Sequence, residues 1–176
     1  MSNGGWDIAP PLILVLGVSS SGKTTIGALI ADELEVPFVD ADSLHPAANL
    51  IKMAAGRPLD DEDRWPWLAR VGKELARADR SKTGLVMACS ALKRSYRDAI
   101  RATAPTLLFV HLSGDREVLA QRAKSRSGHF MPTALLDSQL ATLEELQPDE
   151  QGFVVDIAHP VAEVVADAVA RVRMSS

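Results

Sequence analysis

This 176-residue chain has little cysteine, no excess of positive charge and no long apolar run. The single cysteine, Cys89, excludes an internal disulfide and fits a reducing compartment, so we expect a cytoplasmic protein. A formal net charge of -4 provides no basic surface for a polyanion, which argues against nucleic acid as a partner. No apolar stretch reaches the roughly 18 residues of a membrane span, and residues 1–11 lack the pattern of a signal peptide. We therefore expect neither membrane association nor export.

The composition is that of an ordinary globular protein. Hydrophobic residues make up 47% of the chain and charged residues 24%, and the length suits one hydrophobic core. No internal repeat, low-complexity tract or long linker divides the sequence. We predict a single domain over residues 1–176, in which the glycine- and proline-containing residues 1–11 form a flexible lead.

Short aliphatic runs alternate with segments of helical periodicity. The run Leu12–Leu16 is continuously aliphatic, which is typical of a strand buried on both faces. The expected strands are 12–16, 37–39, 85–88, 107–112 and 153–157, and the expected helices are 23–34, 64–78, 92–102, 116–123, 133–146 and 161–172. This alternation predicts an α/β fold in which helices flank a five-stranded parallel sheet.

A phosphate-binding motif lies between the first expected strand and the first expected helix. Residues 17–25 read GVSSSGKTT and complete the pattern GxxxxGK[ST]. Its glycines let backbone N–H groups turn toward phosphate, Lys23 supplies an ammonium for the β- and γ-phosphates, and the Thr24 hydroxyl is a ligand for Mg²⁺. The expected ATP-binding residues of the motif are Gly17, Ser19, Ser20, Ser21, Gly22, Lys23, Thr24 and Thr25. Because kinases, NTPase motors and GTPase switches share this cradle, the motif alone does not choose among them.

Two acidic residues stand at the end of the second expected strand, at the edge where open α/β sheets bind ligands. Asp42 is the candidate base that accepts the proton of an acceptor hydroxyl, and Asp40 is expected to hold water of the Mg²⁺ shell. Both also fit solvated loop acids or helix caps. They open the segment 40–63, which is long, charged and marked by proline, and which we predict to be an acceptor-binding insertion.

Three further segments resemble the gluconokinases of the shikimate-kinase-like P-loop group. Residues 40–68 read DADSLHPAANLIKMAAGRPLDDEDRWPWL, residues 89–98 read CSALKRSYRD and residues 126–130 read RSGHF. The resemblance covers residues 12–172, and it departs from the family at Ala41, where glycine is frequent, and at Ser43, where a bulkier residue is common. It implies a homodimeric kinase that transfers phosphate from Mg-ATP to position 6 of D-gluconate and so feeds gluconate into pentose phosphate or Entner-Doudoroff metabolism.

An acceptor with one carboxylate and several hydroxyls requires cationic and hydrogen-bonding side chains. Lys93 and Arg97 are four apart in an expected helix, so they are predicted to share a face and converge on one anion. Basic residues at this spacing are also typical of a solvated surface, and His45 and His129 also fit hydrogen-bonded loop histidines. We expect the acceptor-binding residues to be Asp42, His45, Lys52, Arg64, Ser90, Lys93, Tyr96, Arg97 and His129.

A basic segment that contains a glycine, residues 122–132, lies between two expected helices and is predicted to be a mobile lid over the phosphates. Within it, Arg126 is the candidate that stabilises charge on the transferred phosphoryl group. The resemblance implies that Arg122 instead stacks on adenine, with the loop at Pro160 closing the other side. Both arginines also fit a helix end whose charge complements the helix dipole.

Together these patterns predict a three-layer P-loop kinase fold with a mobile lid, in which ATP and Mg²⁺ serve in-line phosphoryl transfer to an acceptor hydroxyl. Lys23, Asp42 and Arg126 are the expected catalytic residues. Shikimate kinase is disfavoured because its glycine-rich stretch after the third strand is replaced by CSALKR, and a nucleoside monophosphate kinase because no base-reading pattern is present. A nucleotide-dependent switch without an acceptor is the alternative from another class of protein.

Overall fold

The computed structural model describes residues 9–125 and 133–175. Its strands form one parallel five-stranded sheet in the order β2-β3-β1-β4-β5, which confirms the predicted α/β class. The strands are β1 Leu12–Leu16, β2 Phe38–Asp40, β3 Leu85–Ala88, β4 Leu108–Ser113 and β5 Gly152–Asp156. The helices are α1 Lys23–Leu34, the short 3₁₀ helix η1 Ala41–Leu44, α2 Ala47–Ala54, α3 Asp61–Ser81, α4 Arg94–Thr103, α5 Arg116–Ser125, α6 Thr133–Thr142 and α7 Val161–Ser175.

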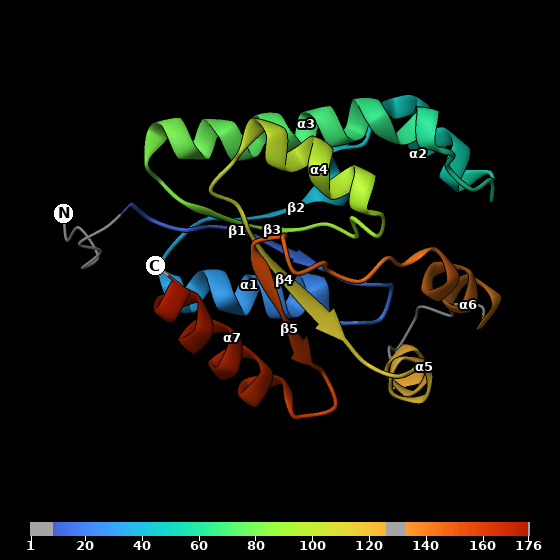
Figure 1. The fold of residues 1–176 in the computed structure, drawn as a ribbon. Coiled ribbons are helices and arrows are strands. Elements are labelled where there is room, and N and C mark those ends of the chain that lie inside the picture. The colour runs from blue at the N-terminus through green and yellow to red at the C-terminus, as the bar shows by residue number, and fades with distance from the viewer. Residues whose placement is uncertain (1–8, 126–132, 176) are drawn as a thin grey trace.

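Alternate side chains of the central strand β1 enter two separate hydrophobic cores. Ile13 and Val15 pack in the core formed with α1 and α7, whereas Leu12, Leu14 and Leu16 pack in the core formed with α3 and α4. Figure 1 shows the resulting three layers, with α3 and α4 on one face of the sheet and α1 and α7 on the other. Burial on both faces explains why the sequence of β1 is aliphatic throughout instead of alternating.

Residues 40–63, the predicted acceptor-binding insertion, contain more helix than the sequence predicted. α2 was not expected, and α3 begins at Asp61 instead of residue 64. The reason is a capping box in which the Asp60 carboxylate accepts a bond from the N–H of Asp63 and the Asp63 carboxylate accepts one from the N–H of Asp60. The acidic first turn also complements the helix dipole, so a run of charge that resembles a loop is the start of a helix.

The parallel sheet gathers the functional loops at one edge, because the carboxyl ends of all its strands point the same way. Residues 17–22 follow the central strand β1, residues 41–44 follow β2 and residues 89–93 follow β3. In Figure 1, α2, α5 and α6 lie toward this end of the sheet. In the described part of the chain, no helix is long and apolar enough to cross a membrane.

His111 is a polar residue in the middle of the sheet. It lies on β4 between Leu16 and Val154, is 2% exposed, and neither ring nitrogen has a hydrogen-bond partner among the described residues. Burial, together with the nearby Arg97 guanidinium, lowers the pKa of His111 below its usual 6.5, against a smaller opposing effect of Glu145. The folded state therefore favours the neutral imidazole.

We expect the free energy of unfolding to fall as the pH drops below about 6.5, because the unfolded chain takes up a proton that the folded His111 rejects. This contribution is fully present above that pH. The variant His111→Leu lacks this pH dependence. In urea titrations, its free energy of unfolding relative to that of the wild type should therefore rise by up to about 1 kcal/mol as the pH is lowered from 7.5 to 5.5. The exposed His159 is the matched control, and a His111→Leu difference that is independent of pH would contradict this assignment.

Candidate functional site

The loop of residues 17–22 has the conformation that a phosphate cradle requires. Gly17 is irreplaceable on steric grounds, since an added Cβ would lie 2.7 Å from Ser21 Oγ and 2.9 Å from the Leu112 carbonyl oxygen. Gly22, the N-cap of α1, has φ +91°, a value that glycine adopts readily. Ser21 donates its N–H to Val18 O at 3.2 Å, which closes the turn. The loop therefore leads into the N-terminus of α1, where backbone N–H groups bind anions.

The lysine and threonine that follow this loop lie where the motif requires them. Lys23 Nζ donates to Val18 O at 3.1 Å and so reaches back across the loop. Thr24 Oγ1 donates to Asp40 Oδ2 at 2.8 Å, which joins the start of α1 to the end of β2. Thr25 is exposed in the first turn of α1. The predicted metal residues Thr24 and Asp40 are thus brought together.

The donors at this point suit Mg²⁺ bound with nucleotide. A hydroxyl and a carboxylate are hard oxygen ligands, and Mg²⁺ in phosphoryl-transfer sites usually keeps waters and phosphate oxygens as its remaining ligands. Among the described residues there is no group of three or more His, Cys, Asp or Glu side chains that would hold a metal on its own. Thr24 and Asp40 would therefore hold the ion only together with nucleotide and water.

Asp42 lies two residues after Asp40, one of the predicted metal residues. Its N–H donates to Asp40 Oδ1 at 2.9 Å, which fixes the first turn of η1. The Asp42 carboxylate is accessible to solvent, yet the protein around it reduces its hydration enough to raise its pKa above the usual 3.8. The negative charge of Asp40 raises this pKa further, while Lys23 and His45 act in the opposite direction. A raised pKa makes the ionised carboxylate a stronger acceptor for a hydroxyl proton.

His45 is held rigidly beside Asp42. Its ring stacks on Trp67 with centroids 4.2 Å apart, and its Nδ1 lies 3.2 Å from Asn49 Nδ2. Burial lowers the pKa of His45, with Asp42 opposing and Arg64 adding to that shift. An amide donor at Nδ1 leaves the proton of the neutral ring on Nε2, so the ring has an N–H donor on its other side.

Three predicted acceptor residues form one cluster with a fourth that was not predicted. Tyr96 donates its hydroxyl to Asp61, and Lys93 Nζ lies 3.2 Å from Asp61 Oδ1. Arg64 Nη1 donates to Tyr96 Oη at 3.4 Å. The hydrogen bonds from Tyr96 and Lys93 lower the pKa of Asp61, and the Asp61 carboxylate raises the pKa of Lys93. Asp61 was missed because it is one of four consecutive acids at residues 60–63.

The remaining predicted acceptor residues have different surroundings. Lys52 Nζ bonds Asp63 Oδ2 at 2.5 Å and thus ties α2 to the capping box of α3. Ser90 is half-buried in the loop after β3. Its neighbour Cys89 is buried, and burial raises the pKa of the thiol to about 12, so this cysteine has no nucleophilic role. His129 lies outside the described residues.

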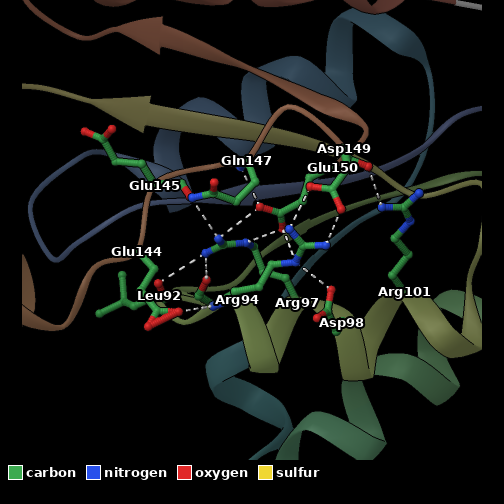
Figure 2. A network of polar contacts seen from close by, with 11 residues as sticks. Leu92, Arg94, Arg97, Asp98, Arg101, Glu144, Glu145, Gln147, Asp149 and Glu150 are labelled. Carbon is green, nitrogen blue, oxygen red and sulfur yellow. Dashed lines mark hydrogen bonds and ion pairs between the residues drawn. The ribbon is translucent and has the colours of Figure 1, made fainter.

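The prediction that Lys93 and Arg97 share a helix face is wrong. α4 begins at Arg94, and Lys93 is its N-cap in an extended conformation. The Arg97 side chain is 0% exposed and binds Glu150, with Nε to Oε1 at 2.7 Å and Nη2 to Oε2 at 3.1 Å. Its remaining bonds go to the carbonyl oxygens of Ala91, Leu92 and Glu145, the last two of which are labelled in Figure 2. All N–H donors of the Arg97 guanidinium are therefore bound within the protein, and none is available to an acceptor substrate. Arg97 instead holds the loop after β3 in place.

Arg122 lies between the phosphate loop and the loop before α7. Its Nη2 donates to the carbonyl oxygens of Ile157 and His159, the second at 3.3 Å, just before Pro160 and α7. Its Nη1 is 3.6 Å from the position of a Cβ built on Gly22, so the guanidinium also approaches the phosphate loop. The rest of the predicted lid from residue 126 to 132, including Arg126, lies outside the described residues.

A further contact to the phosphate loop was not predicted. The Gln139 side chain, from α6, accepts a hydrogen bond from the backbone N–H of Ser19 at 2.6 Å. The sequence around Gln139 carries no motif that would have drawn attention to it. Ser19 and the buried Ser20 are both in the loop, as predicted.

We expect the variant Arg97→Ala to lose about 3–5 kcal/mol in free energy of unfolding, because it leaves the Glu150 carboxylate buried without its partner. Burial alone would raise the pKa of Glu150, but the Arg97 guanidinium and the Gln147 N–H lower it on balance. The double variant Arg97→Met, Glu150→Leu should lose less, since no charge remains buried.

Guanidinium chloride titrations measure both effects. The exposed pair of Arg94 and Asp149 serves as the control, and Asp149→Asn should change stability little. Equal losses for the single and double variants would contradict the assignment of a buried ion pair.

Comparisons with known proteins agree with the sequence resemblance. The model of the shikimate kinase family matches residues 19–168. The thermosensitive gluconokinase of Escherichia coli is 47% identical over 153 residues, which cover 86% of this chain and 81% of that protein. The gluconokinase of Gluconobacter oxydans is 46% identical over 81% of this chain and 80% of that protein.

Solved structures extend the comparison to the fold. A gluconokinase from Sinorhizobium meliloti superposes with a TM-score of 0.86 at 48% identity, over 94% of this chain and 93% of that chain. Shikimate kinase from Aquifex aeolicus gives a TM-score of 0.61 at 16% identity, which shows a common fold alone. By identity over nearly its whole length, the chain belongs to the gluconokinase family within the shikimate-kinase-like proteins.

Proposed function

We propose that this protein transfers the γ-phosphoryl group of ATP to the 6-hydroxyl of D-gluconate and releases ADP and 6-phospho-D-gluconate. The observation that carries the proposal is the hydrogen-bonded chain from Thr24 through Asp40 to the N–H of Asp42. It links the nucleotide loop to a carboxylate with a raised pKa, beside a cluster of cationic side chains. Membership of the gluconokinase family supplies the acceptor.

Asp42 acts as the base in this scheme. Its carboxylate accepts the proton of the 6-hydroxyl as the oxygen forms a bond to the γ-phosphorus, and the bond from that phosphorus to the β,γ-bridging oxygen breaks. The neutral His45, with its N–H donor, orients the hydroxyl or the carboxylate. Positioning of the two reactants supplies most of the acceleration.

The phosphate loop carries the charge of the nucleotide. Lys23 and the backbone N–H groups at the start of α1 bind the phosphates, and Thr24 with Asp40, through water, would hold the metal. Bound Mg²⁺ would neutralise charge on the β- and γ-phosphates. Arg122, with the loop at Pro160, borders the adenine, and Arg126 is proposed to stabilise the transferred group.

The acceptor cluster binds the carboxylate and hydroxyls of gluconate. Arg64 and Lys93 provide cationic donors, while Tyr96 and Asp61 provide a hydroxyl and a carboxylate that suit the polyol chain. Further proposed contacts are His45, Lys52, Ser90 and His129.

A panel of acceptors tests the proposal. Release of ADP by the purified protein with Mg-ATP is measured with D-gluconate, shikimate, glycerate or a nucleoside monophosphate as acceptor. We expect turnover with gluconate to exceed turnover with each of the others by at least about 10²-fold, because a site built for particular polar groups rejects analogues that leave them unpaired. Equal or greater turnover with shikimate would mean that gluconate is not the preferred acceptor. Slow ATP hydrolysis that no acceptor stimulates would favour a nucleotide-dependent switch.

The variant Asp42→Asn should lower kcat by about 10²–10⁴-fold, because an amide does not accept the hydroxyl proton. The KM for ATP should change little. In the wild type, kcat should fall on acidification through the pKa of Asp42, which lies above 3.8. Asp167→Asn, on the exposed face of α7, is the matched control. Near-normal turnover of Asp42→Asn would contradict the assignment of Asp42 as the base.

We also propose a cytoplasmic homodimer. The compartment is supported by the single buried thiol, and the dimer by the family resemblance. A groove of about 670 Å³ between α1 and α7, lined by Leu29, Val165 and Val169, contains none of the proposed site residues. Light scattering of the purified protein tests the dimer, and a monomer at tens of micromolar would refute it.

A further inference from the structure

α6 reaches the nucleotide loop through one side chain. Gln139 Oε1 accepts the backbone N–H of Ser19 at 2.6 Å, across 120 residues of sequence. Both residues are partly buried, so the bond is shielded from competition with water. Because Ser19 belongs to the GxxxxGK[ST] motif, this bond links the helix that follows the predicted lid directly to the phosphate loop.

The chain that continues from α6 is bound to the opposite side of the site. The N–H of Glu144 donates to Leu92 O at 2.8 Å, in the acceptor loop of residues 89–93. The same segment ends at Glu150, which holds Arg97 in the buried ion pair. Figure 2 shows these contacts side by side at the start of α4. Residues 139–150 therefore contact both the nucleotide loop and the acceptor loop.

Each of the two loops has a non-glycine residue in the left-handed region of backbone conformation. Ser20 has φ +69° and directly follows Ser19, whose N–H is bound by Gln139. Ala91 has φ +39°, and its carbonyl oxygen accepts a bond from Arg97. Such conformations persist only where the surrounding structure holds them, and they gather at functional sites. In both loops the holding contact leads to the same segment.

We propose that residues 139–150, which we call the brace, set the separation between the nucleotide loop and the acceptor loop, and that Gln139 is the positioning residue at its nucleotide end. The inference rests on the proposed transfer of phosphate between two bound substrates. In-line transfer needs the acceptor oxygen and the γ-phosphorus within a few tenths of an ångström of the right geometry, and a misplacement of about 1 Å costs on the order of 10²-fold in rate. A brace between the loops fixes that geometry.

The chemistry of glutamine suits this position. Its carboxamide oxygen accepts the Ser19 N–H without bringing a negative charge next to the nucleotide phosphates. A methionine has nearly the same shape but accepts hydrogen bonds only weakly, whereas a glutamate keeps a strong acceptor and adds a charge. The two substitutions therefore separate the hydrogen bond from the size of the side chain.

The experiment compares Gln139→Met, Gln139→Glu and wild type in the presence of Mg-ATP. The quantities measured are kcat, both KM values, the melting temperature, and the fraction of ATP hydrolysed without phosphorylation of the acceptor. Gln151→Met is the control, because Gln151 is an exposed glutamine at the amino end of β5, away from the site. A change in the coupling fraction reports on positioning, and loss of stability alone does not produce it.

For Gln139→Met we expect kcat for transfer to fall by about 10-fold or more, the KM for the acceptor to stay within about 2-fold, and the uncoupled fraction to rise. Gln139→Glu should restore coupling toward the wild-type value while raising the KM for ATP by charge repulsion. Gln151→Met should match wild type.

Wild-type coupling and kcat in Gln139→Met would overturn the proposal. So would a fall in melting temperature with unchanged coupling, or a lower KM for ATP at unchanged kcat, which would mean that Gln139 competes with phosphate. The wild-type panel separates this test from the proposed function. If another acceptor replaces gluconate, the same ratios are measured with that acceptor, and if none is phosphorylated, both proposals fail.

Discussion

The acceptor side of the site depends on one buried ion pair. A guanidinium and a carboxylate are tolerated away from water only when their hydrogen-bonding groups are satisfied. Arg97 meets this condition through Glu150 and through the carbonyl oxygens of Ala91, Leu92 and Glu145. The bonds that satisfy the buried charge therefore also fix the loop after β3. The need to satisfy the buried Arg97 thus sets the backbone geometry of this loop. It also explains why Ala91, a non-glycine residue, has a left-handed conformation there.

The nucleotide side of the site is positioned in a different way, by the order of the parallel strands in the sheet. β1 is central, and β3 separates it from β2, yet the Thr24 hydroxyl still reaches Asp40. Asp40 in turn accepts the N–H of Asp42, so one carboxylate joins the start of α1 to the start of η1. Asp40 and Asp42 are two residues apart but have different surroundings, because the Asp40 carboxylate accepts bonds from Thr24 and from the N–H of Asp42, whereas the pKa of Asp42 is raised, which suits the proposed base. Two like charges at this spacing also help to raise the pKa of Asp42.

The features that could be predicted from the sequence have local signals. The GxxxxGK[ST] motif contains its own conformational requirement, and aliphatic runs between helical periods determine a parallel sheet, which then places Asp40 near Thr24. Arg97 was assigned wrongly to the acceptor and Gln139 was not assigned at all, because their partners lie 53 and 120 residues away and nothing in either local sequence indicates them. Asp61 was hidden for the opposite reason, since its acidic neighbours made it resemble a solvated run.

The cluster that we propose to bind the acceptor has a charge balance that bears on specificity. Arg64 and Lys93 are two cations, and the Asp61 carboxylate, held by Tyr96 and Lys93, neutralises one of them. One net positive charge remains, together with a carboxylate and a phenol able to bond hydroxyls. A neutral sugar would leave that charge unpaired, and an acceptor that already carries a phosphate would bring more negative charge than the cluster neutralises. If this cluster binds the acceptor as proposed, a polyol with a single carboxylate matches its charge and its hydrogen-bonding groups better than either of these.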